Sequence, residues 1–404
     1  MAYAPSVSSS CHNGGDGGIP LSRLLSVQVS GSVLTWARTS VGIPLDKAAE
    51  RLDLSPQELA SREASGGTFG LAELEHMSTV YRRPVAALLF SAPPVEPPLP
   101  TDHRTVRAQG QFPLSTPTIL AVRFAQRVQE LAEDVARLAG DETGTRLPSA
   151  SLSDDPDAVA RRLREALGVS LATQSAWRGE YDPLNGWTSA AEALGVYVLR
   201  QKMPWEETRA FVLAGLPAVV VLNSEDSPNG RVFSLLHELC HLMLSSASVC
   251  DMRFKGYDSA SESVEVFCNR CAGTALVPER VLLSEVSGRR EDPSWTDSEL
   301  RTLARKFGVS QEVVLRRLLI VGKTDGEFYS RWREQDEERY AAYRANRNKD
   351  GWQPIAPRTV QENGHLFTRQ VLRAEGSQAL SSAEAAQYLN VGTKHLDKMR
   401  GLLP

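Results

Sequence analysis

The sequence predicts an α+β fold that is predominantly helical, with one small sheet near the middle of the chain. Apolar residues recur at helical spacing through most of its length, most clearly over 116–138 and 156–167. Only short runs are typical of strands, at 196–199, 209–213 and 218–222. Because strand-like runs are so few, helices must supply most of the hydrophobic core.

Length and charge set the broad class of the protein. At 404 residues the chain is long enough for roughly two to four domains. A net charge of −4 excludes a globally basic nucleic-acid binder, although a local basic face stays open. Five cysteines, an odd number, favour a reducing compartment over a disulfide scaffold. Since we find neither an apolar signal segment nor a membrane span, we expect a soluble, cytoplasmic protein without a membrane partner.

The first part of the chain reads as a tail followed by short helices. Residues 1–24 are rich in Ser and Gly and predict a disordered tail. Residues 25–92 predict a helix-turn-helix domain, in which Ser55 and Pro56 are the start signals of one helix. That helix offers only Arg62 as a cation, so DNA binding and the docking of a protein partner remain equal alternatives.

A proline-rich stretch at 93–105 predicts a stiff, extended linker. The amphipathic runs that follow it predict a helical bridge over 106–184, packed on the next domain.

The most informative stretch is 231–244, where His237-Glu238-x-x-His241 lies inside a helical pattern. At about 100° per residue, Ser234 and these three side chains share one face and the apolar residues share the other, so the polar face should be open. Imidazoles four residues apart can reach one tetrahedral Zn²⁺. Glu238 can take a proton from a water and pass it to a leaving amine. A buried helix with two satisfied histidines is the alternative interpretation.

A third protein ligand must come from another part of the chain. Residues 261–278 predict a second helix, ended by Pro278, with Glu262, Glu265 and Asn269 on one face. Helical spacing does not choose between Glu262 and Glu265. For either glutamate, plain solvent exposure is the simpler interpretation.

These two helices resemble the ImmA/IrrE family of zinc metallopeptidases. The resemblance covers Asn229-Gly-Arg-Val-Phe-Ser-Leu-Leu-His-Glu-Leu-Cys-His and the later Glu-x-x-Cys-Asn-x-Cys-Ala, followed by Leu-Val-Pro. It implies that His237, His241 and Glu265 bind Zn²⁺, that Glu238 is the catalytic acid and base, and that 185–325 is a zincin-like metallopeptidase domain. Residues 25–92 in turn resemble the Xre-type helix-turn-helix domain that often precedes such a peptidase. Mn²⁺ accepts similar ligands.

Three cysteines depart from the family pattern. Cys240 stands where Gly is usual, Cys268 replaces Ala, and Cys271 replaces Phe. Oxidation of Cys240, which lies beside the metal face, would disturb the metal, but a small buried thiol is the favoured interpretation. We interpret Cys268-x-x-Cys271 as packing, since no second cysteine pair accompanies it.

The strand-like runs before the predicted helix at 231–244 predict a small, partly antiparallel sheet. We hypothesise that the run 209–213 is an edge strand that holds the substrate backbone beside the metal, so that Phe211→Pro should raise KM. The loop 245–261 contains candidate groups for stabilising the oxyanion, without a motif that chooses among Cys250, Arg253, Lys255 and Tyr257.

The end of the chain predicts further helices. Residues 295–319 predict a helical hairpin that resembles the C-terminal cap of the family's peptidase domain. A mixed-charge helical connector over 326–363 follows. Residues 364–404 predict a helix-turn-helix-like module, which could present Lys394, Lys398 and Arg400 to nucleic acid or serve in dimerisation or docking.

The motifs together predict a zinc-dependent endopeptidase flanked by helix-turn-helix modules. By resemblance, its substrate is a protein, expected to be a DNA-binding repressor in stress or mobile-element regulation. The rival function is a DNA-binding transcriptional regulator with a structural or sensing metal site. Glu238 favours catalysis, because a structural zinc site has no need of a carboxylate beside its histidines.

Overall fold

A computed structural model describes residues 26–99, 114–141, 144–247, 259–288, 292–346 and 353–403. The chain divides into two compact units, with the boundary between Glu96 and Pro97. Most described residues are helical and the sheets are small, so the predicted α+β, predominantly helical class is confirmed. The predicted tail and the candidate oxyanion residues from Cys250 to Tyr257 lie outside the described residues.

The first unit contains short helices and one small hairpin. Its elements are β1 (Ser26–Val29), α1 (Gly31–Thr39), α2 (Leu45–Arg51), α3 (Pro56–Ser65), β2 (Gly67–Gly70), α4 (Leu71–Tyr81) and α5 (Val85–Leu88). The sequence predicted helices only, whereas β1 and β2 pair antiparallel. The second strand has the sequence Gly-Thr-Phe-Gly. Because two of its four residues are glycines, its strand propensity is low and the sequence does not predict it.

Glycine is needed where the hairpin meets the helices. A Cβ on Gly31 would lie 2.4 Å from the carbonyl oxygen of Glu63, and Gly66 has φ +70°. The start of α1 therefore approaches the end of α3 more closely than any larger residue allows.

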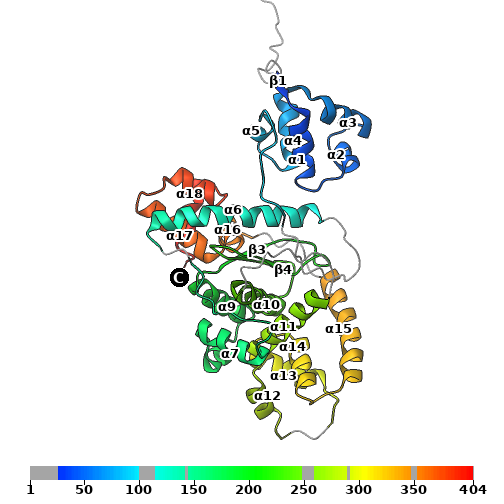
Figure 1. Ribbon diagram of the computed structural model, residues 1–404, viewed down its shortest axis with the longest axis vertical. Helices are drawn as coiled ribbons and strands as arrows, with labels where there is room; N and C mark the ends of the chain where they lie inside the picture. Colours follow the sequence, from blue (N-terminus) through cyan, green and yellow to red (C-terminus); the bar gives the residue numbers. More distant parts are fainter. Residues whose placement is uncertain are drawn as a thin grey trace, which may run out of the picture. The chain divides into compact units, whose positions relative to one another are not determined.

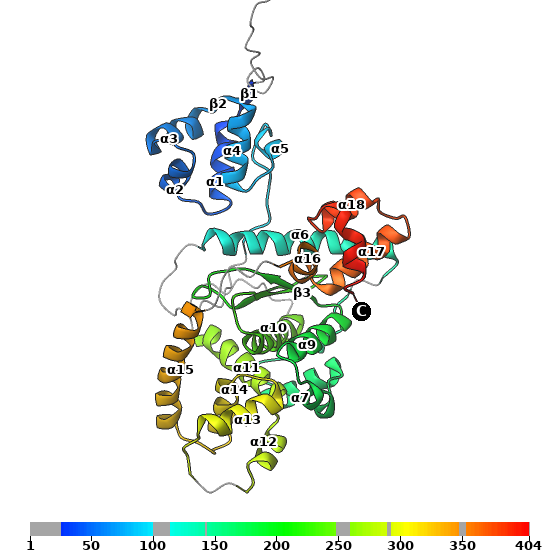
Figure 2. The ribbon, with the colours of Figure 1, turned by 180° about the vertical axis from the view of Figure 1, so that it is seen from behind.

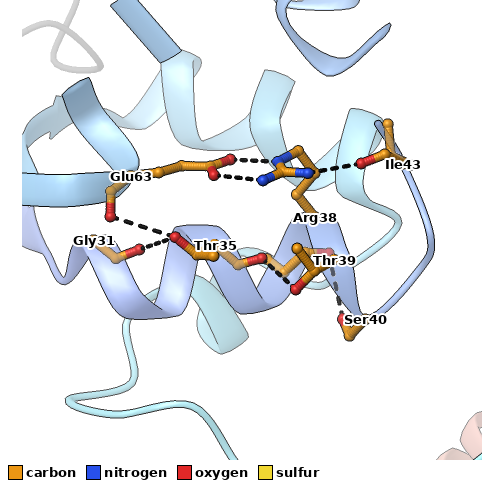
Figure 3. Close-up of polar contacts among 8 residues, drawn as sticks. Gly31, Thr35, Arg38, Thr39, Ser40, Ile43 and Glu63 are labelled. Atoms are coloured by element: carbon orange, nitrogen blue, oxygen red, sulfur yellow. Dashed lines mark hydrogen bonds and ion pairs between the residues drawn. The ribbon is translucent and has the colours of Figure 1, made fainter. Parts of the chain in front are cut away.

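A buried ion pair holds α1 against α3 (Figure 3). The Arg38 guanidinium donates to both carboxylate oxygens of Glu63, at 2.7 and 2.8 Å. Its Nη1 also donates to the Ile43 carbonyl, at 2.9 Å. Thr35 Oγ1 donates to the carbonyl of Gly31 at 3.1 Å. The hydrogen bond with Glu63 raises the pKa of Arg38. The two helices are thus fixed in one geometry by a bidentate contact.

The second unit contains the three-stranded sheet and the remaining helices. Its elements are α6 (Thr116–Ala139), α7 (Pro156–Leu167), α8 (Leu171–Ala176), α9 (Asp182–Ala193), β3 (Tyr197–Gln201), β4 (Ala210–Leu213), β5 (Val219–Asn223), α10 (Pro228–Ala247), α11 (Ser259–Leu276), α12 (Glu279–Glu285), α13 (Asp297–Phe307), α14 (Gln311–Ile320), α15 (Gly326–Asn346), α16 (Ile355–Asn363), α17 (His365–Gly376), α18 (Ser382–Tyr388), a 3-10 turn (Thr393–His395) and α19 (Leu396–Arg400).

The sheet has the strand order β3-β5-β4, with β3 parallel and β4 antiparallel to β5. Successive side chains point to opposite faces, so each strand contributes to two cores. Val220 and Leu222 pack in the core that contains α10, whereas Val219 and Val221 pack in the core that contains α6. The second unit is therefore layered, with helices on both faces of the sheet (Figures 1 and 2).

The C-terminal helices belong to the layer that covers the second face. In both views α16 and α17 lie beside α6 on that side of the sheet (Figures 1 and 2). Tyr197 of β3 donates through its hydroxyl to Gln370 Oε1 at 2.6 Å, and its ring centroid lies 6.5 Å from that of Phe367. The C-terminal helices thus share a hydrophobic core with the sheet that precedes α10.

Within the described ranges, no helix has the length and apolarity that crossing a bilayer requires.

Candidate metal centre

The metal helix α10 is buried on almost every side. It lies between the sheet, α9 and α11 (Figures 1 and 2). We expected its polar face to be open, but Ser234, His237 and Glu238 are each at most 3% exposed. The expectation was wrong because α11 packs along that face, a long-range contact that periodicity does not show. At the far end of this face the side chains of His241 and Glu265 are 20% and 37% exposed.

Three side chains from α10 and α11 converge at this end. The Nε2 atoms of His237 and His241 lie 2.9 Å apart. Glu265 places Oε2 3.4 Å from His237 Nε2 and Oε1 3.1 Å from His241 Nε2. Donors bound to one tetrahedral Zn²⁺ at 2.0–2.1 Å are about 3.3 Å from one another. The spacing and the two-nitrogen, one-oxygen chemistry both fit a zinc site.

Glu265, and not Glu262, completes this group. Among the described residues, the cluster able to hold a metal ion consists of His237, His241 and Glu265. Glu262 is exposed and does not join it. The structure therefore separates two glutamates that helical spacing left equivalent.

Charge is concentrated at the centre. Burial by itself would raise the pKa of Glu265, but hydrogen bonds with His237 and His241 lower it well below its usual range. Burial would lower the pKa of His241, yet hydrogen bonds with Cys268 and Glu265 and the charge of Glu238 raise it. The carboxylate and the imidazoles thus stabilise each other's charged forms, and the negative charge of Glu265 is available to a cation that replaces the proton of His241.

The three cysteines form a buried group between α10 and α11. Cys240, Cys268 and Cys271 are fully buried, and Cys240 is hydrogen-bonded to Cys271. Burial raises the pKa of Cys240 and of Cys268, which keeps the thiols protonated and unreactive. The contact that sequence reasoning missed is the hydrogen bond between Cys268 and His241. Its only signal was that Cys268 follows Glu265 by three residues and so shares its helix face.

The segment that contains this centre was compared with known families. Residues 191–319 match Peptidase_M78, the IrrE N-terminal-like domain. The match supports the ImmA/IrrE family for this part of the chain and a metallopeptidase-type function. Comparisons with curated proteins and with solved structures found no match.

In the IrrE-like domain, β4 is an edge strand. The Asn223 amide donates to the Arg209 carbonyl at 2.9 Å. Because alternate residues of an antiparallel strand point their N–H and C=O groups to the same side, the backbone groups of residues 209, 211 and 213 point toward β5. The backbone groups of Val212 point to the free edge. Phe211 is 3% exposed and packs in the core with α6. Phe211→Pro would remove a hydrogen bond between β4 and β5, so a change in KM in this variant would not report on substrate binding.

A cleft of about 890 Å³ adjoins the metal centre of the IrrE-like domain. Phe233 and Ser234 of α10 line it, and the Phe233 ring centroid lies 6.2 Å from that of His237. Asn269 of α11, residues between 205 and 227, and residues of α14 and α15 also line it. Sequence reasoning missed the cleft because its lining comes from segments far apart in the chain.

Proposed function

We propose that the IrrE-like domain is a zinc-dependent endopeptidase that hydrolyses a protein substrate. The observation that supports it best is the convergence of His237, His241 and Glu265 beside a buried Glu238, within a segment that matches a peptidase family. Three protein ligands leave one position for water or substrate, as catalytic zinc sites require.

Each residue then has a chemical task. Bound Zn²⁺ supplies a Lewis acid that polarises the scissile carbonyl and acidifies a water. Glu238 accepts the proton of the attacking water and later donates it to the amine that leaves. Because Glu238 is 3% exposed, little bulk water competes for its proton. The free edge of β4 would hold the substrate backbone as an added strand.

The substitution Glu238→Gln tests this function. It removes the base but keeps the ligand set, so zinc content should be retained while cleavage falls roughly 10²–10⁴-fold. Proteome-wide cleavage mapping would measure the effect and would identify the substrate. Glu262→Gln makes the same chemical change at an exposed position of α11. This variant should cleave the substrate at the wild-type rate. Cuts that persist in Glu238→Gln would exclude Glu238 as the base.

We further propose that the partner is a protein, namely a DNA-binding repressor in stress or mobile-element regulation. The rival function is DNA-binding regulation through residues 25–92. Residues 26–96 contain six Lys or Arg and eight Asp or Glu, a poor balance for neutralising phosphates. Arg62, the cation of α3, is ion-paired with Glu73 and lies over the Phe69 ring. This pairing favours a protein contact for the first unit, and tight, salt-sensitive binding of duplex DNA would contradict it.

A further inference from the structure

The cleft beside the metal centre runs along the same helix that provides the histidines. Phe233 and Ser234 line it one turn before His237 and Glu238. A peptide whose scissile bond lies at the metal would therefore place a neighbouring side chain in the cleft. At about 890 Å³, the cleft has room for several side chains.

One wall of the cleft is built around Asp226, which is 1% exposed. Its Oδ1 accepts from the Ser227 amide at 2.8 Å and from the Tyr340 hydroxyl at 3.2 Å. Its Oδ2 is buried without a hydrogen bond to any described residue, and Arg209 Nη1 lies 3.9 Å away. A buried carboxylate oxygen in this state has unused capacity for a donor.

A further wall is formed by the first turn of α14 and the second half of α15. Glu312 and Asp336 line it. Burial raises the pKa of Asp336, and the negative charges of Glu312, Asp297 and Glu337 raise it further, against the opposing effect of Arg339. The carboxylates on this wall therefore repel one another, and a cation between them would relieve the repulsion.

The basic residues of the cleft do not balance its acids. Five carboxylates line it, against the three guanidinium groups of Arg209, Arg316 and Arg333. Arg333 is paired with Glu337, at 3.1 Å from Nε to Oε1. Arg209 stacks over the Trp205 ring, with its guanidinium carbon 4.3 Å from the ring centroid. The lining side chains therefore sum to a net charge of −2, and Arg339 Nε, which lies outside the lining, is 4.0 Å from Asp336 Oδ1.

We infer that this cleft is a subsite that selects substrates with a lysine or arginine side chain close to the scissile bond. The inference rests on the proposed peptidase function and names the substrate class for the same centre. The aromatic rings of Trp205, Phe233 and Tyr340 would pack on the aliphatic stem of such a side chain. The carboxylates of Asp226, Glu312 and Asp336 would receive its charge.

The test compares two peptides that differ only by lysine or norleucine beside the scissile bond. The double variant Glu312→Gln/Asp336→Asn removes two charges from the cleft. The control Glu334→Gln/Glu338→Gln removes two charges from exposed positions of α15 that do not line it. We expect the wild type and the control to favour the lysine peptide in kcat/KM by roughly tenfold, and the cleft variant to lose most of that ratio.

Binding supplies a readout that does not depend on turnover. Fluorescence anisotropy with zinc-loaded Glu238→Gln should show the same preference for lysine, weakened by added salt. A lysine preference in binding without any cleavage by the wild type would reject the proposed function and leave the subsite standing. Cleavage without a lysine preference, or a preference that the cleft variant keeps, would overturn the subsite.

Discussion

The position of one carboxylate decides whether the two imidazoles can hold a metal. Glu265 directs one oxygen at each Nε2 atom, at 3.4 and 3.1 Å, and so closes the donor set. Glu265→Gln replaces this anionic oxygen donor by a neutral amide. Zinc affinity should fall roughly 100-fold or more, because even groups outside the ligand set cost 10- to 100-fold when lost. Competition with a chromophoric chelator measures the change.

Glu262→Gln is the matched control for that substitution, since Glu262 is exposed on the same helix. Its zinc affinity should equal that of the wild type. If Glu262→Gln lost zinc and Glu265→Gln kept it, the ligand assignment would be reversed.

A second carboxylate couples stability to pH. Glu192 is 5% exposed and accepts from the His365 amide at 3.0 Å. Burial raises its pKa to about 7, from an ordinary value of 4.5. Between these values the folded protein keeps a proton that the unfolded chain has released. Stability should therefore fall as pH rises from about 4.5 to about 7, by roughly 3 kcal/mol from this group, and stay low above that range.

Glu192→Gln keeps an acceptor for the His365 amide and removes the titration. Denaturant unfolding at a series of pH values should show the variant gaining stability over the wild type as pH rises through that window. Glu165→Gln, at an exposed position of α7, is the control and should follow the wild type. If the free energy of unfolding of the wild type rose relative to that of Glu192→Gln between pH 4.5 and 7, the prediction would be contradicted.

Among the elements, β4 offers the sharpest test of substrate binding. The amide of Val212 faces the free edge and its side chain packs toward the core that contains α10. Val212→Pro removes that donor but leaves the hydrogen bonds to β5 in place, so KM should rise roughly tenfold with a smaller loss of stability. Steady-state kinetics and thermal unfolding check both parts.

Val212→Ala is the control, because it trims the side chain and keeps the amide. Its KM should stay close to that of the wild type. An unchanged KM in Val212→Pro would dispose of the added-strand hypothesis.

The elements also show what the sequence could and could not predict. The amphipathic runs at 116–138 and 156–167 coincide with α6 and α7, since a long apolar stripe signals a helix directly. The hairpin of β1 and β2 was missed because its second strand, Gly-Thr-Phe-Gly, has low strand propensity and pairs with residues about 40 positions earlier in the chain. Glu265 was preferred only through a family resemblance, and the cleft was invisible because Trp205, Asp226 and Tyr340 meet only in space.

On the scale of the whole molecule, one sheet joins two hydrophobic cores. Its first face packs with α10, which carries the histidines, and its second face packs with α6 and the C-terminal helices. Loss of order in the second core therefore has two routes to α10, one through the three strands and one through α9, where Glu192 accepts from the His365 amide. We therefore expect the C-terminal helices to stabilise the candidate metal centre indirectly, through the elements that pack on α10.

A chain that ends at residue 346 tests this dependence. It would uncover Tyr197 and Leu199 of β3, the strand on which α16 and α17 pack, and these side chains are at most 4% exposed. At about 1.5–3 kcal/mol for each buried side chain, the loss approaches the net stability of a typical domain. The truncated protein should fail to bind zinc and should unfold without a cooperative transition. Phe367→Ala is the milder variant, expected to cost about 3–5 kcal/mol and to keep zinc. Removal of residues 1–96, a separate compact unit, should leave zinc binding intact. If the chain that ends at residue 346 bound zinc as tightly as the wild type, the second core would be dispensable for the metal centre.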